Sequence, residues 1–165
     1  TAFAAPDFDE TMAAAKQGEA YAQHNLGVMY ENGEGVPEND TEAVRWYRKA
    51  ADQGLSNAQY NLGVMLDLGN GVPENDTEAV KWFRKAADQG HAKAQSILGV
   101  MYYGGEGVPE NNIRAYVWLS MAKTQGHTAA TENLEILKPQ MTKQQIAEGQ
   151  ALAAKCYESD YKDCD

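Results

Sequence analysis

The sequence AQYNLGVMLDLGNGVPENDTEAVKWFRKAADQG, residues 58–90, decides the fold because the chain contains it in three versions. Moved back by 36 residues it becomes AQHNLGVMYENGEGVPENDTEAVRWYRKAADQG, and moved forward by 36 it becomes AQSILGVMYYGGEGVPENNIRAYVWLSMAKTQG. A fixed period of about 20 to 50 residues is typical of proteins built from stacked structural repeats. We therefore predict a repeat protein with full copies over about 19–54, 55–90 and 91–126.

Each copy has the pattern of two helices separated by a loop. In the first copy, an apolar stripe predicts a helix from about 19 to 31. The loop GEGVP at 33–37 ends this helix, because glycine permits positive φ and proline prevents continuation. Asn39 and Glu42 have capping-box spacing at the start of a second helix, which Gly54 ends.

Incomplete copies extend the pattern at both ends. Residues 7–18 align with a second helix, and residues 128–138 align with a first helix that Pro139 ends. Thr142 and Gln145 then have capping-box spacing at the start of a last helix that reaches about residue 157. Degenerate end units are typical of solenoid caps. We predict an all-α solenoid of about nine helices without strands, as one domain over 7–158 between a segment 1–6 and a tail 159–165.

Composition and charge exclude several classes of partner. A chain of 165 residues is long enough for one domain with a hydrophobic core. Its net charge of -10 and its pI near 4.7 argue against nucleic acid and anionic membranes as partners. The longest apolar runs are only a few residues, too short to span a bilayer. We expect no nucleic-acid binding, no membrane insertion and a monomer.

Both termini carry signs of export. Cys156 and Cys164 are eight residues apart, which on one unbroken helix is about 12 Å and too far for a disulfide. A turn around 159–160, similar to the turn at 52–54, would bring them within bonding range; two free thiols are the alternative. Residues 2–4, Ala-Phe-Ala, have the pattern that ends a secretory signal peptide, or belong to an alanine-rich terminus. We favour an exported protein with a disulfide-bonded C-terminus.

Three motifs at the 36-residue period, A-x-x-x-L-G-x-x-Y, G-x-G-V-P and A-x-x-W-Y/F-x-x-A-A-x-x-G, resemble the Sel1-like repeat, a relative of the tetratricopeptide repeat. The resemblance covers at least residues 7–138. The C-x7-C pair is similar to those of the cysteine-rich bacterial branch, where such pairs bridge adjacent helices, although this chain has one pair only. The resemblance implies a right-handed superhelix of helix hairpins that acts as an adaptor, often periplasmic or secreted in bacteria.

Asparagines on the first helices are the leading candidates for partner binding. The amide group of Asn25 or Asn61 has the donors and the acceptor needed to hold a peptide backbone, and the resemblance places this position in the concave groove. Ile97 replaces it in the third copy, and an intramolecular hydrogen bond to the neighbouring repeat is the alternative. The same face varies between copies and suits a peptide with an apolar anchor and some positive charge. The candidate concave-face residues are His24, Asn25, Val28, Glu31, Tyr60, Asn61, Val64, Asp67, Ser96 and Tyr103.

The tryptophans and the basic residues favour structural roles. Trp46, Trp82 and Trp118 share one position on the second helices, with alanines three residues before and four after. Large residues beside small ones allow neighbouring helices to interdigitate, so we expect core packing rather than an exposed aromatic platform. Lys and Arg side chains of the second helices suit a solvated outer face.

Enzyme signatures are nearly absent. Ser120 and Ser159 each begin the S-x-x-K pattern of serine β-lactamases and penicillin-binding proteins, but no Ser-Asp-Asn or Lys-Thr-Gly element accompanies them. His91 and His127, one repeat apart, would lie roughly 10 Å apart, too far to share a metal ion. We predict a non-catalytic adaptor for a protein or peptide, with no metal and no cofactor. A β-lactam-binding enzyme and an assembly component that uses convex or end surfaces are the alternatives.

Overall fold

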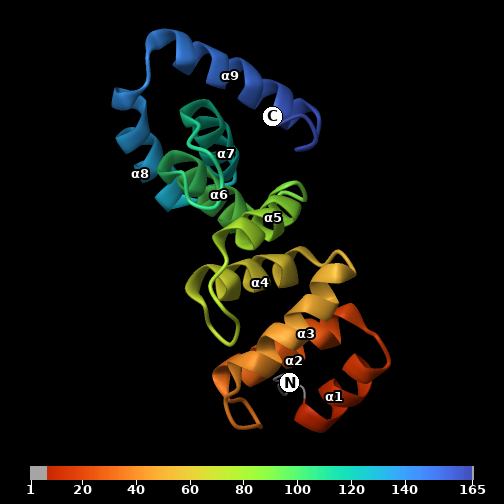
Figure 1. Cartoon of the computed structure of the whole chain (residues 1–165). Coiled ribbons are helices and arrows are strands. Elements are labelled where there is room, and N and C mark those ends of the chain that lie inside the picture. Colours follow the sequence, from red (N-terminus) through yellow and green to blue (C-terminus); the bar gives the residue numbers. More distant parts are fainter. Residues whose placement is uncertain (1–6, 165) are drawn as a thin grey trace. The chain divides into compact units, whose positions relative to one another are not determined.

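The computed structural model describes residues 7–164, which form nine α-helices and no strand (Figure 1). The chain divides into two compact units, residues 1–74 (unit 1) and residues 75–165 (unit 2), and each is described by itself. The predicted helices are all present, with ends within about two residues of those expected. They are α1 (Phe8–Lys16), α2 (Ala20–Asn32), α3 (Asp40–Asp52), α4 (Ser56–Leu68), α5 (Asp76–Ala87), α6 (Ala92–Gly104), α7 (Asn112–Thr124), α8 (Thr128–Leu137) and α9 (Lys143–Glu158), with a 3-10 turn η1 (Lys138–Gln140) before α9.

In unit 1, each helix packs against the next one along the chain, from α1 to α4. Ala15, Leu26 and Trp46 form a buried cluster that joins α1, α2 and α3. Phe8 packs edge-on against Tyr30, with ring centroids 5.7 Å apart. The apolar stripes of the sequence therefore face one another, as their spacing predicts.

In unit 2, α7 is the central helix and packs against α6, α8 and α9. Its Trp118 and Leu119 are fully buried. Helix α9 approaches α7 closely at Gly149. A Cβ atom at this position would lie only 2.8 Å from the ring of Tyr116. The reciprocal capping box predicted for Thr142 and Gln145 is present at the start of α9.

The tryptophans are core residues, as predicted. Trp46, Trp82 and Trp118 are exposed by 5%, 6% and 0%. Lys49 lies 3.7 Å from the ring centroid of Trp46, and Lys85 lies 3.9 Å from that of Trp82. These lysines are exposed and lie over the outer edge of the core with their side chains.

The second helix of each repeat is capped by an asparagine side chain. The side chain of Asn39 accepts a hydrogen bond from the backbone N–H of Glu42 at 3.1 Å. Contrary to the capping-box prediction, the Glu42 carboxylate does not return to Asn39; it faces Arg45 at 3.4 Å. Asn39 already supplies the side-chain cap of this helix, so the Glu42 carboxylate can pair with Arg45, three residues further along.

The second glycine of each G-x-G loop holds that loop against the preceding second helix. Gly71 has φ +66, and a Cβ atom there would overlap the backbone of Asp40 at the start of α3. Gly107 has φ +64 and lies in the same way against Asp76 at the start of α5. Only glycine combines this backbone angle with this approach, which explains why the loop repeats.

Buried glutamines, which the sequence interpretation missed, join successive hairpins. Gln23, Gln59 and Gln95 are exposed by 6%, 4% and 0%. The side-chain amide of each donates to a backbone carbonyl eight residues earlier, near the end of the preceding helix, at 3.1 to 3.2 Å. Each of these carbonyls also accepts from the backbone N–H three residues later, so the glutamine amide adds a second hydrogen bond at the helix end.

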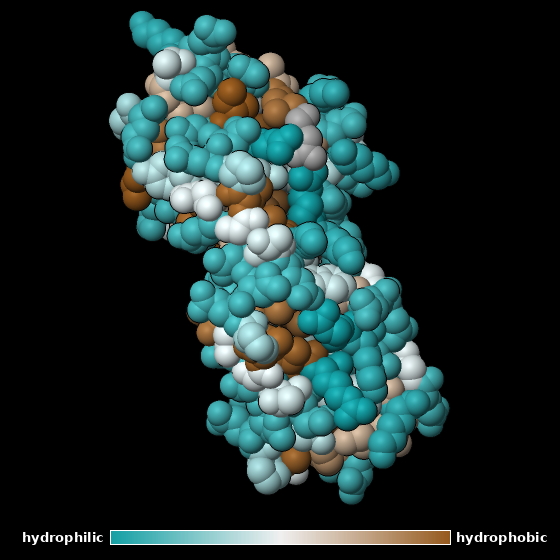
Figure 2. All heavy atoms as spheres, in the orientation of Figure 1, coloured by the Kyte–Doolittle hydropathy of each residue, from teal (hydrophilic) through white to brown (hydrophobic). Residues whose placement is uncertain are grey.

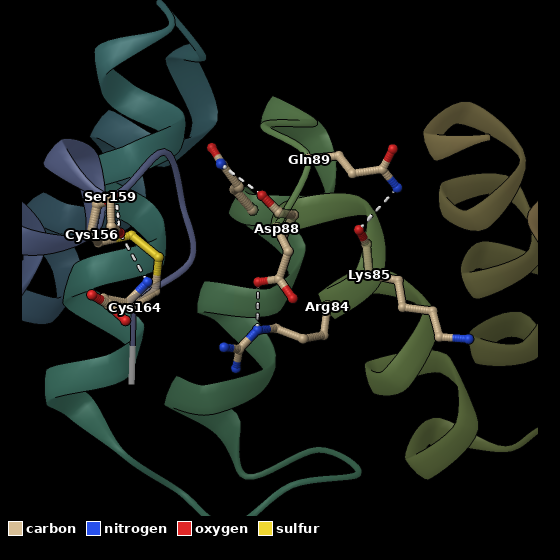
Figure 3. A network of polar contacts seen from close by, with 10 residues as sticks. Arg84, Lys85, Asp88, Gln89, Cys156, Ser159 and Cys164 are labelled. Carbon is tan, nitrogen blue, oxygen red and sulfur yellow. Dashed lines mark hydrogen bonds and ion pairs between the residues drawn. A yellow bond between two sulfur atoms is a disulfide. The ribbon is translucent and has the colours of Figure 1, made fainter. Parts of the chain in front are cut away.

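The C-terminal cysteines form a disulfide, as favoured from the sequence. The Cα atoms of Cys156 and Cys164 lie 4.4 Å apart (Figure 3). They come together because the chain turns sharply after α9, where Asp160 and Tyr161 have positive φ. The hydroxyl of Ser159 donates to the Cys156 carbonyl at 3.0 Å and accepts from the N–H of Asp163 at 2.9 Å. The possible signal-peptide remnant lies outside the described residues. Among those described, no helix is long and apolar enough to cross a membrane.

Candidate partner-binding site

The exposed face of α2 carries a histidine that links two helices of unit 1. The His24 ring is half-buried and tilted against the Tyr47 ring, with centroids 5.7 Å apart. Its Nε2 atom lies 3.3 Å from the side-chain nitrogen of Asn61 on α4, and its Nδ1 atom lies 3.4 Å from the side-chain oxygen of Asn25. A neutral ring with a proton on Nδ1 satisfies both contacts, since Nδ1 then donates to Asn25 and Nε2 accepts from Asn61.

Burial favours this neutral form. It lowers the pKa of His24, although the hydrogen bond to Asn25 and the charge of Glu31 oppose the shift. The buried Tyr47 hydroxyl donates to Glu31, and burial together with this bond raises the pKa of Tyr47. Glu31 is the one carboxylate in this network.

The predicted asparagines differ in their availability. Asn61 is half-buried and already bonded to His24, which is the intramolecular contact that the sequence left open as an alternative. Asn25 is exposed and uses only its oxygen towards His24, so its amide N–H groups point to no partner in the described chain. Asn25 is therefore the better placed of the two to hold a backbone carbonyl.

The other candidates divide between the two units. Val28 on α2 and Val64 on α4 are half-buried, as are Tyr60, Glu31 and Asp67 of the same unit. Two candidates belong to unit 2. There Ser96 is only 4% exposed, contrary to its expected place on an open face, and the Tyr103 hydroxyl accepts from the side chain of Gln140 at 2.6 Å.

A hollow of about 380 Å³ opens beside Asn25 in unit 1. Apolar side chains of α1 and α2 form its floor, and two carboxylates and an amide form its rim; its lining residues are Asp7, Phe8, Asn25, Val28, Met29, Glu34 and Gly35. We call this site the α1–α2 hollow. The sequence interpretation included Asn25 and Val28 but missed the rest, because the packing of α1 brings Phe8 to α2. The spacing of apolar residues within one helix does not predict this contact between two helices.

Apolar side chains are otherwise sparse on the visible surface. Figure 2 shows a largely hydrophilic face on which apolar residues gather in small separate patches. Isolated patches of this kind are usual on soluble proteins, whereas a concave apolar site with a polar rim is a candidate for binding.

The structure places the two candidate nucleophiles, Ser120 and Ser159, in different surroundings. The Ser159 hydroxyl is engaged by Cys156 and Asp163 in the C-terminal turn. Ser120 is half-buried on α7 in a shallow groove. His91 caps α6, its Nδ1 atom accepting from the N–H of Ala94 at 3.2 Å. In the described chain no cluster of three His, Cys, Asp or Glu residues could hold a metal ion.

Comparisons with known proteins agree with this architecture. A protein-family model described as the Sel1 repeat matches residues 20–55, 56–91 and 92–127. A protective antigen of uropathogenic Escherichia coli strains, which displays an SLR fold, is 37% identical with a TM-score of 0.85. That match covers 93% of this chain and 33% of the antigen, so the chain spans about a third of the antigen's length.

Two further solved structures show the same kind of fold. A Sel1 repeat protein from Oxalobacter formigenes is 38% identical, with a TM-score of 0.71 over 77% of this chain and 96% of its own. Cysteine rich protein B of Helicobacter pylori is 20% identical, with a TM-score of 0.61 over 80% of this chain and 100% of its own, and shares the fold alone. No curated protein matches significantly. The fold is an all-α helical-repeat solenoid.

Proposed function

The chain belongs to the Sel1-repeat family, and on that premise we propose that it is a non-catalytic scaffold that binds a protein or peptide partner. Sel1-repeat folds commonly serve as protein-interaction scaffolds, which supports the general class. The observation that carries the proposal is the α2 face of unit 1. It combines an exposed asparagine amide, a half-buried valine row and the α1–α2 hollow on a preformed helical frame.

A rigid frame suits this role for an energetic reason. Buried glutamine bonds and close glycine contacts fix the helices before a partner arrives, so binding does not have to order them. The Asn25 amide can then donate to a partner backbone carbonyl while Val28 and Val64 contact a side chain. The Glu31 carboxylate favours a partner segment that carries positive charge.

The disulfide supports an exported location. Disulfides persist in oxidising compartments and are rare in the cytosol, so an oxidising extracytoplasmic compartment is indicated. We propose that the protein works in the bacterial periplasm or is secreted.

Affinity capture with matched variants tests the scaffold. The oxidised protein is immobilised, exposed to an envelope extract, and its bound proteins are quantified by mass spectrometry. We expect Asn25→Asp combined with Asn61→Asp to reduce the specific partner at least about tenfold, because amide N–H donors become carboxylate acceptors that cannot hold a backbone carbonyl. Asn57→Asp makes the same substitution at an exposed position of α4 and should retain the partner.

The variants must keep the helical circular-dichroism spectrum of the parent for the comparison to hold. A partner bound equally by the parent and by the folded double variant would remove the α2 face from the proposal. Rapid covalent labelling by a fluorescent penicillin, lost in Ser120→Ala or Ser159→Ala, would contradict the non-catalytic assignment itself.

A further inference from the structure

The α1–α2 hollow has a better covered counterpart 36 residues along the chain, within the same unit. Asn25, Val28 and Met29 of the hollow correspond to Asn61, Val64 and Met65. Met29 is 8% exposed where Met65 is 1% exposed, and Asn25 is exposed where Asn61 is half-buried. The two sites share their backbone frame but differ in how much of it is covered.

A helix reaches the counterpart. His24 of α2 bonds to Asn61, and Gly27 brings α2 so close to α3 that a Cβ atom there would lie 2.6 Å from the Tyr47 ring. The backbone carbonyl of Tyr30 accepts from the N–H of Asn39 at 2.8 Å, which fastens the end of α2. The counterpart therefore shows that a helix packed beside this frame, with a small residue facing α3, can place a polar side chain against the asparagine.

The rim of the hollow differs from its counterpart in charge. Asp7 and Glu34 stand where Ala43 and Asn70 stand one repeat later. Among the described residues that line the hollow there is no Lys or Arg, and both carboxylates are exposed. An occupant of this site therefore gains from positive charge, which α2 itself does not carry.

We propose that the α1–α2 hollow binds an amphipathic helix of a partner protein, with basic residues at its edge. A large apolar side chain of that helix packs on Phe8, Val28 and Met29, and a polar side chain one turn away accepts from the amide of Asn25. A Lys or Arg side chain pairs with Asp7 or Glu34. This inference rests on the proposed scaffold function and deepens it, because it names the partner as a basic amphipathic helix.

A synthetic helix tests the inference directly. The probe is a peptide with the α2 sequence of residues 19–32 in which both glutamates are replaced, Glu19→Lys and Glu31→Lys, and a lactam bridge on the side that faces away holds it helical. The parent α2 peptide and a scrambled peptide of the same composition are the controls. Binding is measured by fluorescence anisotropy, and the site is located by backbone amide chemical shifts.

We expect the lysine probe to bind at least about fivefold more tightly than the parent peptide, since each favourable ion pair at an exposed rim contributes up to roughly 1 kcal/mol. The chemical-shift changes should centre on residues 7–8, 25–29 and 34–35. Glu34→Lys on the protein should reverse the preference between the two peptides, and Val28→Gln should weaken both by roughly tenfold. Gln17→Lys, on the exposed end of α1, is the matched charge control and should change neither.

Several results would overturn the inference. Equal binding of the scrambled peptide would show that no amphipathic helix is recognised, and shifts confined to α4 would place the site elsewhere. A monomer–dimer equilibrium abolished by Glu34→Lys would assign the hollow to a second copy. Tighter probe binding after deletion of residues 1–6 would assign it to the chain's own terminus.

The test separates this inference from the proposed function. If the probe does not bind while the captured partner still depends on Asn25 and Asn61, the helical occupant is wrong and the scaffold stands. If neither the probe nor any partner depends on the α2 face, both are wrong.

Discussion

The first repeat, in unit 1, and the third repeat, in unit 2, have the same frame and different faces. Gly27 lies against Tyr47, and its equivalent Gly99 lies against Leu119, where a Cβ atom would be 2.7 Å from Cγ. Tyr47 donates to Glu31, whereas the buried Leu119 has no polar group to satisfy. The same close approach between helices is thus compatible with a polar face and with an apolar one.

The residues at the histidine and asparagine positions of the first helices also differ between these two repeats. Where the first repeat has His24 and Asn25, the third has Ser96 and Ile97. The bond between His24 and Asn61 therefore has no equivalent built from the same residue types in the third repeat. The glutamines and loop glycines that contact a neighbouring backbone are the same in each copy, while several side chains of the first helices change. A scaffold of this kind can change its partner without changing its fold.

Loop glycines should give the largest effects, because they belong to the shared frame. We expect Gly71→Ala in unit 1 and Gly107→Ala in unit 2 each to lower the free energy of unfolding by about 3 kcal/mol or more, since a Cβ atom would overlap the backbone of the preceding helix. Gly54→Ala and Gly126→Ala are the matched controls. Their φ is also positive, at +91 and +80, but no atom lies within 4 Å.

The controls should cost only about 1 kcal/mol, the usual penalty for alanine in the left-handed region. Urea unfolding of the four variants measures the difference. Equal losses for Gly71→Ala and Gly54→Ala would mean that backbone angle alone explains the glycines, and the contact between the loop and the preceding helix would lose its role.

The disulfide should give a smaller effect that is confined to unit 2. It closes a loop of nine residues, for which chain entropy predicts a stabilisation of about 2–3 kcal/mol. Cys156→Ser combined with Cys164→Ser should lower the unfolding free energy of unit 2 by about that amount and leave unit 1 unchanged. Hydrogen exchange, read separately in α9 and in α2, measures both, and a reductant should affect the parent protein but not the variant.

Faster exchange in α2 of the serine variant would contradict this confinement. Unchanged exchange at the end of α9 would show that the hydrogen bonds of Ser159 hold the turn without the covalent bond.

Most of the frame could be predicted from the sequence, because it depends on contacts that recur with the period. The glycine–proline loop, the asparagine cap and the buried tryptophan each have a local signature, and each is where the spacing placed it. Gln23 and its equivalents also recur in each copy, one position after an alanine of the apolar stripe. Their role was missed because a glutamine beside that stripe usually faces solvent, and only the packed helix end turns it inward.

The candidate site could be predicted less well, because it depends on pairs of side chains from different helices. The spacing identified Asn25 and Asn61 as equivalent, yet Asn61 is bonded to His24 of α2, whereas Asn25 is exposed in the part of the chain that the structure describes. Likewise, Met29 is 8% exposed and lines the hollow, whereas its equivalent Met65 is 1% exposed. Equivalent positions in a repeat protein acquire different environments from whatever precedes them along the chain.

The smallest expected effect is a dependence of stability on pH, which can be measured separately in unit 1 and in unit 2. Because burial lowers the pKa of His24 below its usual value of 6.5, the folded state takes up a proton less readily than the unfolded chain. The stability of unit 1 should therefore be highest above about pH 6.5 and fall as the pH decreases below it. Nuclear magnetic resonance of the imidazole ring measures this pKa directly.

His91 in unit 2 is the internal comparison. Burial lowers its pKa as well, with the charge of Lys93 acting in the same direction, so the pH profile of the whole chain contains both groups. His24→Gln keeps a hydrogen-bonding side chain and should remove only the pH dependence of unit 1, as read from exchange in α2 and α3. The groups that face His24 are Glu31, Asn25, Asn61 and Tyr47. Of these, Asn25 through its hydrogen bond and Glu31 through its charge favour the charged ring. A measured pKa above 6.5 would mean that Asn25 and Glu31 together outweigh burial, and the dependence of stability on pH would then have the opposite sign.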